Sequence, residues 1–153
     1  MPLSGSCSAL VPAPPDRVFA RIVDLARLPE WNDRMTGVTE VPERLEPGAE
    51  WVVGMKLLGK RFASRSTVVE LDRSRRRFVH RSKPDDDNPS NTVWTWQVDP
   101  DGDASRVTLA WELRPLTPVR RLLAAPLRSR QIPRHDAPAS LAALARACQE
   151  VTA

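Results

Sequence analysis

The stretch that decides the fold is VWTWQVDPDGDASRVTLAWEL, residues 93–113. Apolar and polar residues alternate in both halves, which is typical of β-strands with one buried face. The apolar positions are Trp94, Trp96 and Val98 in the first half, and Val107, Leu109, Trp111 and Leu113 in the second. Asp101-Gly102-Asp103 between them is a hairpin turn signal. Residues 93–113 therefore predict an antiparallel hairpin with one buried face.

On the C-terminal side of this hairpin, everything after Pro118 predicts helix, with breaks at Pro126 and Pro133. The last part is amphipathic, and its apolar residues step four, three, four and three along one face: Ala137, Leu141, Leu144, Cys148 and Val151. Asp136 is the expected N-cap, with Pro138 in the first turn.

On the N-terminal side, residues 50–57, 61–71 and 75–82 predict further strands joined by tight turns. Residues 83–91 predict an acidic, proline-bracketed loop, which is either a solvated loop tip or a lid over the mouth of a pocket. Before these strands we expect a short strand at residues 6–11, a helix over 13–25 and a second short helix over 28–33.

This order predicts an α+β helix-grip fold, in which a curved antiparallel sheet of about seven strands wraps around a long C-terminal helix. Strands joined by short turns form antiparallel sheets, and an amphipathic sheet must bury one face. The last helix is the main element available to cover that face. A curved sheet that grips one helix leaves space near its ends, so we expect an internal cavity.

The length of 153 residues fits a single domain spanning residues 1–153. No apolar run approaches the roughly 20 residues needed to span a bilayer, and the N-terminus lacks the features of a signal peptide. We therefore expect a cytoplasmic protein, monomeric or homodimeric. In that compartment Cys7 and Cys148 are expected to be thiols, although a disulfide is conceivable if the chain ends meet.

The net charge is +4, and seven arginines but only two acidic residues follow Leu113. These arginines are dispersed, so we do not expect nucleic acid as the partner. Two cysteines and two histidines without close spacing do not supply a zinc site. There is no phosphate-binding glycine loop and no hydrolase motif, so we expect no metal and no cofactor.

The sequence resembles the START-like, or SRPBCC, superfamily, within it the polyketide cyclase/dehydrase and lipid-transport branch. The resemblance rests on the order of elements and on VPAPPDRVF (residues 11–19), DLARLPEW (24–31), VELD (69–72) before Arg77-Phe78, WTW (94–96) and SLAAL (140–144). It implies a deep pocket between the sheet and the C-terminal helix. It implies no particular activity, because carriers, receptors and cyclases share this fold.

The candidate ligand-binding residues lie on strands, on faces that we expect to point inward. They are Trp51, Met55, Arg65, Thr67, Phe78, His80, Trp94, Trp96, Leu109 and Trp111. The tryptophans would form flat apolar walls, or alternatively fill the core. Arg65 and Thr67 share a strand face with Val69 and Leu71, so they either point inward, where Arg65 would bind a carboxylate or phenolate, or face solvent. His80 is the candidate catalytic residue, as a general acid or base, and the alternative is a hydrogen-bonded or exposed histidine without a catalytic role. We expect Trp31 to be packing and His135 to lie at the surface.

The leading hypothesis is the binding of a small hydrophobic molecule, such as a lipid, a polyketide or an aromatic compound, in the cavity. A second hypothesis is a polyketide aromatase/cyclase-like or dehydratase-like enzyme that uses His80 and Arg65. A third is a toxin-like interaction protein that acts through its basic C-terminal surface.

Overall fold

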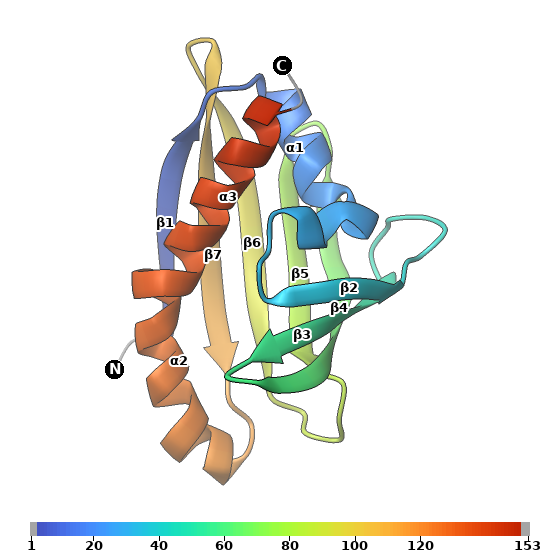
Figure 1. Cartoon of the computed structure of the whole chain (residues 1–153), viewed down its shortest axis with the longest axis vertical. Helices are drawn as coiled ribbons and strands as arrows, with labels where there is room; N and C mark the ends of the chain where they lie inside the picture. Colours follow the sequence, from blue (N-terminus) through green and yellow to red (C-terminus); the bar gives the residue numbers. More distant parts are fainter. Residues whose placement is uncertain (1–2, 151–153) are drawn as a thin grey trace.

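A computed structural model describes residues 3–150 of the chain (Figure 1). Its elements are β1 (Ser4–Val11), α1 (Pro15–Val23), the 3₁₀ helix η1 (Leu25–Glu30), β2 (Met35–Glu40), β3 (Glu50–Leu57), β4 (Lys60–Asp72), β5 (Arg77–Pro84), β6 (Asn91–Asp101), β7 (Ala104–Arg114), the π-helical turn η2 (Arg120–Ala124), α2 (Ala125–Gln131), the π-helical turn η3 (Ile132–Asp136) and α3 (Ala137–Glu150).

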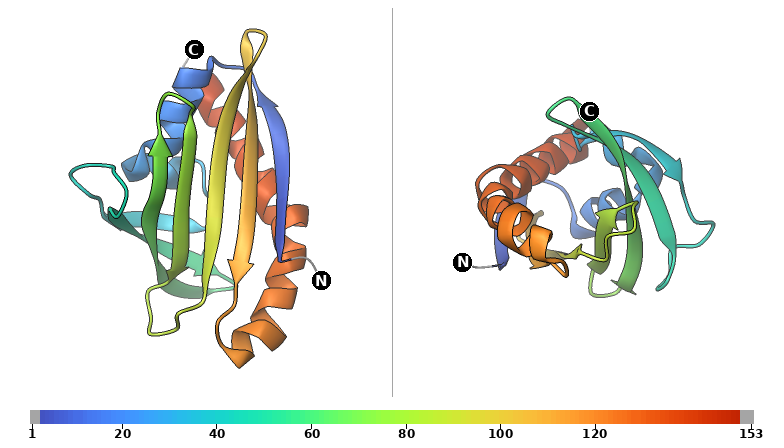
Figure 2. Two further views of the ribbon diagram at one scale, coloured as in Figure 1. Left: turned by 180° about the vertical axis from the view of Figure 1, so that it is seen from behind. Right: turned by 90° about the horizontal axis from the view of Figure 1, so that it is seen from below.

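The seven strands form one sheet in the order β1-β7-β6-β5-β4-β3-β2, and every neighbouring pair is antiparallel. The two short helices separate β1 from β2, so these strands lie at opposite edges of the sheet. The sheet curls around the C-terminal helix, which crosses its concave face (Figure 2). The predicted α+β helix-grip fold is confirmed.

The register of the strands determines which side chains share the concave face. Trp96 of β6 lies opposite Phe78 of β5 and Leu109 of β7, so all three point the same way. The tight turn at Gly102 sets the register of β6 and β7, and its positive φ is one that glycine adopts without steric cost. The hairpin predicted over residues 93–113 is therefore present, and both of its strands are longer than expected.

A β-bulge in β4 changes which residues face inward. The pairing between β4 and β5 shifts between Val68 and Glu70, and Val69 is 46% exposed. A bulge inserts one unpaired residue, so the alternation of faces changes phase at that point. Val68 is buried on the inner side of the bulge, whereas sequence alternation grouped Val69 with Leu71.

The helices near the N-terminus begin where proline and apolar spacing indicate. Pro15 occupies the first turn of α1, and Val18, Phe19 and Ile22 are buried at helical spacing. The second short helix, η1, begins at Leu25, three residues before the expected start at residue 28. Its proline lies inside a 3₁₀ helix instead of in the first turn of an α-helix.

The C-terminal helix is continuous from Arg120 to Glu150, so the predicted breaks at Pro126 and Pro133 are wrong. A π-helical turn precedes Pro126 and another contains Pro133. These wider turns accommodate the missing amide N–H and the ring clash that proline brings to an α-helix. Asp136 is consequently not an N-cap, because the helix runs through it. Val151 lies outside the described residues.

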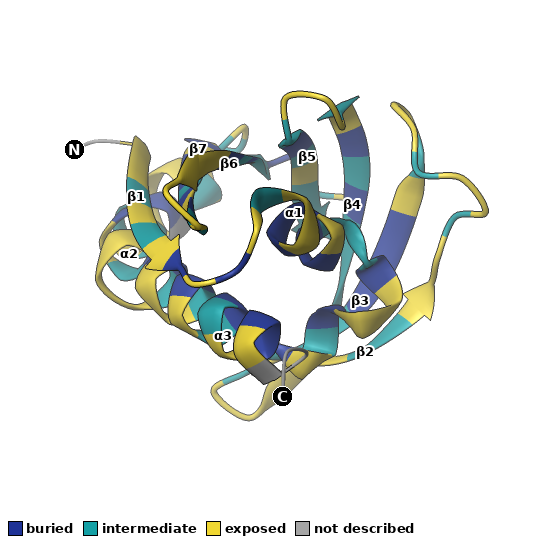
Figure 3. Cartoon of the chain, turned by 90° about the horizontal axis from the view of Figure 1, so that it is seen from above, coloured by how far each residue is buried: buried dark blue, intermediate teal, exposed yellow. Residues whose placement is uncertain are grey.

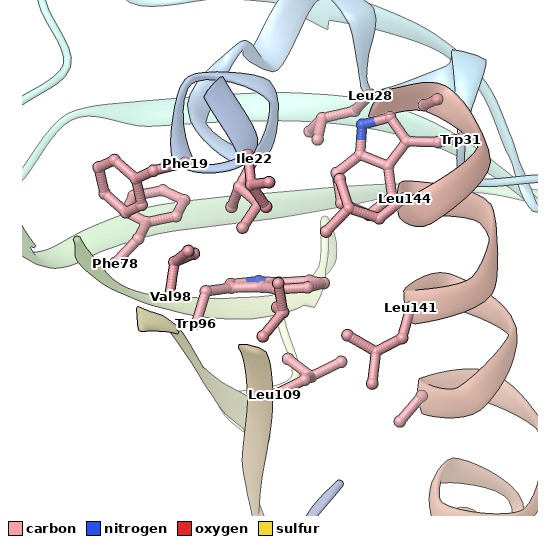
Figure 4. Close-up of a cluster of buried hydrophobic side chains, with 14 of the residues drawn as sticks. Phe19, Ile22, Leu28, Trp31, Phe78, Trp96, Val98, Leu109, Leu141 and Leu144 are labelled. Atoms are coloured by element: carbon pink, nitrogen blue, oxygen red, sulfur yellow. The ribbon is translucent and has the colours of Figure 1, made fainter. Parts of the chain in front are cut away.

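One end of the interior is filled with apolar side chains, and we call it the packed half. Val18, Val98, Val107 and Leu144 are fully buried there, where α1 and α3 meet β6 and β7 (Figure 3). Leu141 and Leu144 of α3 face Trp96 and Leu109 of the sheet (Figure 4). This half of the fold is close-packed, as protein interiors usually are.

Candidate ligand cavity

The other end of the interior contains a cavity of about 640 Å³, and we call this end the cavity half. Strands β3 to β6, η1 and the C-terminal helix all contribute to its walls. Aromatic rings line much of it: Trp31, Trp51, Phe62, Phe78, Trp94 and Trp96. Its volume falls within the range of about 300–1,000 Å³ that is typical of small-molecule sites.

Several of the helical residues that line the cavity have small side chains. Ala125, Ala139, Ser140 and Ala143 are the helical residues of this kind in its lining. One helical turn after Ser140, Leu144 fills the packed half and is fully buried. The small residues leave room opposite the rings of the sheet, and larger helical side chains, among them Leu127 and Gln131, line the rest of the helical wall.

His80 lies in the cavity wall between aromatic rings. Its ring centroid is 5.1 Å from that of Trp51 and 5.2 Å from that of Phe78. Its position deep in the fold lowers the pKa of His80 to about 3, because burial disfavours the charged imidazolium. The imidazole is therefore neutral at neutral pH, and its Nδ1 has no hydrogen-bond partner among the described residues.

Among the other polar groups in the lining, one is hydrogen-bonded and two are buried without a partner in the described chain. Trp94 Nε1 donates a hydrogen bond to Ser82 Oγ at 2.8 Å. Trp31 Nε1 and Asn91 Oδ1 are buried, and neither has a partner within residues 3–150. Buried polar atoms without partners are uncommon in folded proteins and call for an explanation. A polar substituent on a bound molecule would provide one.

An ion-pair bridge joins the two sides of the cavity. Arg34, just before β2, lies 2.8 Å from Asp136, and Arg128 of α2 lies 2.9 Å from the other carboxylate oxygen. All three residues line the cavity. Burial lowers the pKa of Arg128, and the carboxylate of Asp136 opposes that effect. Two guanidinium groups share one carboxylate, so the bridge carries a net positive charge.

Seven of the ten candidate residues line the cavity: Trp51, Met55, Phe78, His80, Trp94, Trp96 and Leu109. Trp111 does not line it. The Trp111 ring packs against Gly5 of β1, where an added Cβ would lie 2.8 Å from the ring. That tryptophan is core packing, one of the two roles that the sequence left open.

Of the two orientations that the sequence left open for Arg65 and Thr67, the inward one is wrong. In β4 the residues that line the cavity are Ser64 and Ser66, so the residues between them face the opposite side. Arg65 pairs there with three carboxylates, those of Glu40, Glu50 and Asp85. The bulge beyond Val68 explains the error, because it breaks the alternation that linked Arg65 to Leu71.

Trp31 and His135 take the expected places, packed and exposed respectively, and both also line the cavity. Trp31 packs edge-to-face on Trp96, with centroids 5.6 Å apart, and it lines the cavity as well. His135 is exposed as expected, yet it contributes to the lining near the bridge. The sequence offered no signal for the bridge, because Arg34 and Asp136 are about a hundred residues apart.

Neither cysteine belongs to the described lining of the cavity. Cys7 and Cys148 carry free thiols, and burial raises the pKa of both. Within the described part of the chain, no group of three or more His, Cys, Asp or Glu side chains is arranged to hold a metal ion. The same residues include no helix long and apolar enough to cross a membrane.

A curved seven-stranded sheet, a long C-terminal helix and a cavity between them define a protein of the START-like helix-grip class. The family model described as polyketide cyclase / dehydrase and lipid transport matches residues 4–149. The chain belongs to this family. No functionally curated protein matches the sequence significantly.

Solved structures with this fold include several distant relatives. The Zhui aromatase/cyclase from Streptomyces sp. R1128 has a TM-score of 0.77 at 16% identity, covering 98% of this chain and 95% of that one. A protein from Thermus thermophilus has a TM-score of 0.73 at 21% identity, covering 98% and 99%. A START superfamily protein from Mycobacterium smegmatis has a TM-score of 0.74 at 13% identity, covering 97% and 98%. At these identities the likeness shows the fold alone.

Proposed function

We propose that this protein binds a small hydrophobic molecule in the cavity between the sheet and the C-terminal helix. The observation that carries the proposal is an aromatic-walled cavity whose buried His80 Nδ1 has no partner in the described chain. Apolar surface transferred from water into such a site contributes about 25 cal/mol per Å². The aromatic rings supply that contribution, and His80 supplies orientation.

The part of the ligand next to His80 is inferred to be neutral and to carry an oxygen function. The imidazole is uncharged and surrounded by aromatic rings, so a charged group beside it would lose hydration without gaining a counter-charge. A hydroxyl or carbonyl group, in contrast, would form the hydrogen bond that Nδ1 lacks. Ser64 and Ser66 on the neighbouring strand add further polar contacts.

The geometry favours binding over acid–base catalysis by His80. An effective general base has a pKa near the working pH, and the pKa of His80 is about 3. Arg65, the second residue of the cyclase-like hypothesis, faces away from the cavity. The likeness to an aromatase/cyclase is therefore not extended to a cyclase activity for this chain.

Native mass spectrometry of freshly purified protein tests the proposal. We expect a co-purified hydrophobic compound in the unsubstituted protein. The Ala143→Phe variant places a ring in the cavity, so it should lose this compound. The matched control is Ala142→Phe, one position along the same helix with an exposed side chain, and it should retain the compound.

A second measurement separates binding from catalysis. Because the cavity contains tryptophans, its bound molecule should quench their fluorescence on titration back into the emptied protein. Quenching should persist, with weaker affinity, in His80→Ala. Equal ligand retention by Ala142→Phe and Ala143→Phe would contradict the proposal, because a molecule held elsewhere would not sense the cavity.

A further inference from the structure

The first turns of the C-terminal helix bury small side chains and expose large ones. Ala125 and Ser129 face the sheet at 6% and 8% exposure, whereas Leu122 and Leu123 are 76% and 70% exposed. A helix that packs only on its own domain shows the reverse pattern, with its leucines inside. This segment extends beyond the end of β7, in orange in Figure 1, so its outer side has no cover from the described chain.

The exposed apolar residues form one cluster, which we call the leucine face. Its members are Leu116, Val119, Leu122, Leu123 and Leu127, each more than half exposed. The described chain has eleven exposed large apolar side chains, and five of them lie within the twelve residues 116–127. Clusters of this kind mark interaction surfaces more often than scattered exposed leucines do.

The same region is strongly basic. Residues 114–134 include six arginines and no acidic residue. Arg130 and Arg134 are exposed and form no ion pair within residues 3–150, and Arg121 donates only to the carbonyl oxygen of Pro115, at 3.1 Å. The exposed leucines favour an apolar partner, and the arginines without ion pairs favour a negatively charged one. A partner with an apolar interior under a negatively charged surface has both properties.

The leucine face also meets the mouth of the cavity. Leu127 belongs to this face and lines the cavity. Across the mouth, Leu58 and Phe62 of the β3–β4 hairpin are exposed and line the cavity too. Figure 2, seen from below, shows the helix and the hairpin on opposite sides of this end of the molecule. A molecule leaving the cavity here would emerge beside the leucine face.

We propose that the leucine face docks the protein on a bilayer that contains anionic phospholipids. Leucines would enter the boundary between head groups and acyl chains, and the arginines would pair with lipid phosphates. A second copy of the chain is a poorer occupant, because two such faces would bring like charges together. Nucleic acid would use the arginines but leave the leucines in water.

Vesicle flotation tests this docking. The probes are vesicles of phosphatidylcholine alone and of phosphatidylcholine mixed with phosphatidylglycerol, each at low and high salt. We expect the protein to float with the anionic vesicles at low salt, and with neither kind at high salt. Leu122→Asp/Leu123→Asp should weaken this association about tenfold or more, because it removes the inserted leucines and adds negative charge.

Matched substitutions elsewhere keep the test specific. Arg130→Glu/Arg134→Glu should weaken vesicle binding about tenfold, whereas Arg73→Glu/Arg75→Glu, with the same change in charge, should leave it nearly unchanged. Val41→Asp, an exposed apolar residue far from the leucine face in sequence, controls for the leucine variant. Circular dichroism identifies any variant that fails to fold.

Three results would overturn the proposal. The first is equal flotation with neutral and anionic vesicles. The second is no flotation together with a dimer in solution that Leu122→Asp/Leu123→Asp dissociates, which would make the leucine face a contact between copies. The third is no flotation together with salt-sensitive binding of RNA. Docking is measured without the cavity ligand, and Ala143→Phe should float normally, so failure here is distinguishable from failure of the proposed function.

Discussion

The packed half and the cavity half of this interior are built from the same sheet and the same helix, yet only one is filled. In the packed half, Leu141 and Leu144 of α3 face Trp96 and Leu109 of the sheet, two residues that also border the cavity. In the cavity half, Ala139 and Ala143 of the same helix line the cavity together with Trp94 of the sheet. The sheet contributes large side chains to both halves, and the small residues Ala139, Ser140 and Ala143 contribute to the open space in the cavity half.

This difference separates stability from binding. Removing atoms from the packed half leaves a new void, whereas removing atoms from the cavity half enlarges a space that already exists. The cavity half also holds the unpartnered atoms of His80 and Trp31, which would be costly in a filled core. The packed half therefore contributes most to the stability of the fold, and the cavity half provides the space in which a ligand would bind.

The largest expected effect compares truncation in the two halves. Leu144→Ala should lower the free energy of unfolding by about 3 kcal/mol, because Leu144 is fully buried in the packed half. Met55→Ala in the cavity half should cost about 1 kcal/mol, since Met55 already borders open space. Urea unfolding of both variants measures the difference. Equal losses would remove the distinction between the halves.

Enlarging one alanine in each half gives the next largest effect. Ala147→Phe overpacks the packed half and should lower the free energy of unfolding by about 2 kcal/mol. Ala143→Phe, one helical turn earlier, adds its ring to open space and should cost about 0.5 kcal/mol or less. Urea unfolding distinguishes them, and a large loss for Ala143→Phe would mean that the cavity closes in solution.

The pH dependence of stability tests the burial of His80. The pKa of His80 is lowered in the folded state, so the unfolded state binds more protons once the pH falls below about 6.5. The free energy of unfolding therefore decreases as the pH decreases. Between about pH 7 and about pH 5.5 the loss from His80 should be about 1.3 kcal/mol. His80→Phe should abolish this part of the pH dependence, whereas His135→Gln should keep it. Urea unfolding at both pH values provides the comparison.

The smallest effect concerns the ion-pair bridge. Asp136→Asn leaves Arg34 and Arg128 without their shared carboxylate and should cost about 1 kcal/mol, a value reduced because Arg128 is one-third exposed. Asp101→Asn, which breaks the surface pair with Arg106, should change stability by about 0.3 kcal/mol or less. Thermal unfolding of the two variants checks this. Similar small changes would show that the bridge contributes no more than a surface pair.

Prediction from sequence succeeded where a local pattern determines the structure. Alternation in residues 93–113 and the turn at Gly102 predicted β6 and β7, and the tryptophans that they place inward follow from that pattern. It failed at the β4 bulge and at Pro133. There, strand pairing and helix packing override the local rule, and a single shifted residue reverses the face of Arg65.

By itself, the sequence determined the order of elements, the antiparallel pairing of neighbours in the chain and the inward faces of most strands, because periodicity and turn chemistry act over a few residues. Only the tertiary structure decided which of the aromatic rings line the cavity and which pack in the core. It also decided that Arg34 and Arg128 share the carboxylate of Asp136, and that leucines near the start of the C-terminal helix are exposed. These features depend on contacts between distant segments. Their geometry is fixed only when the sheet closes around the helix.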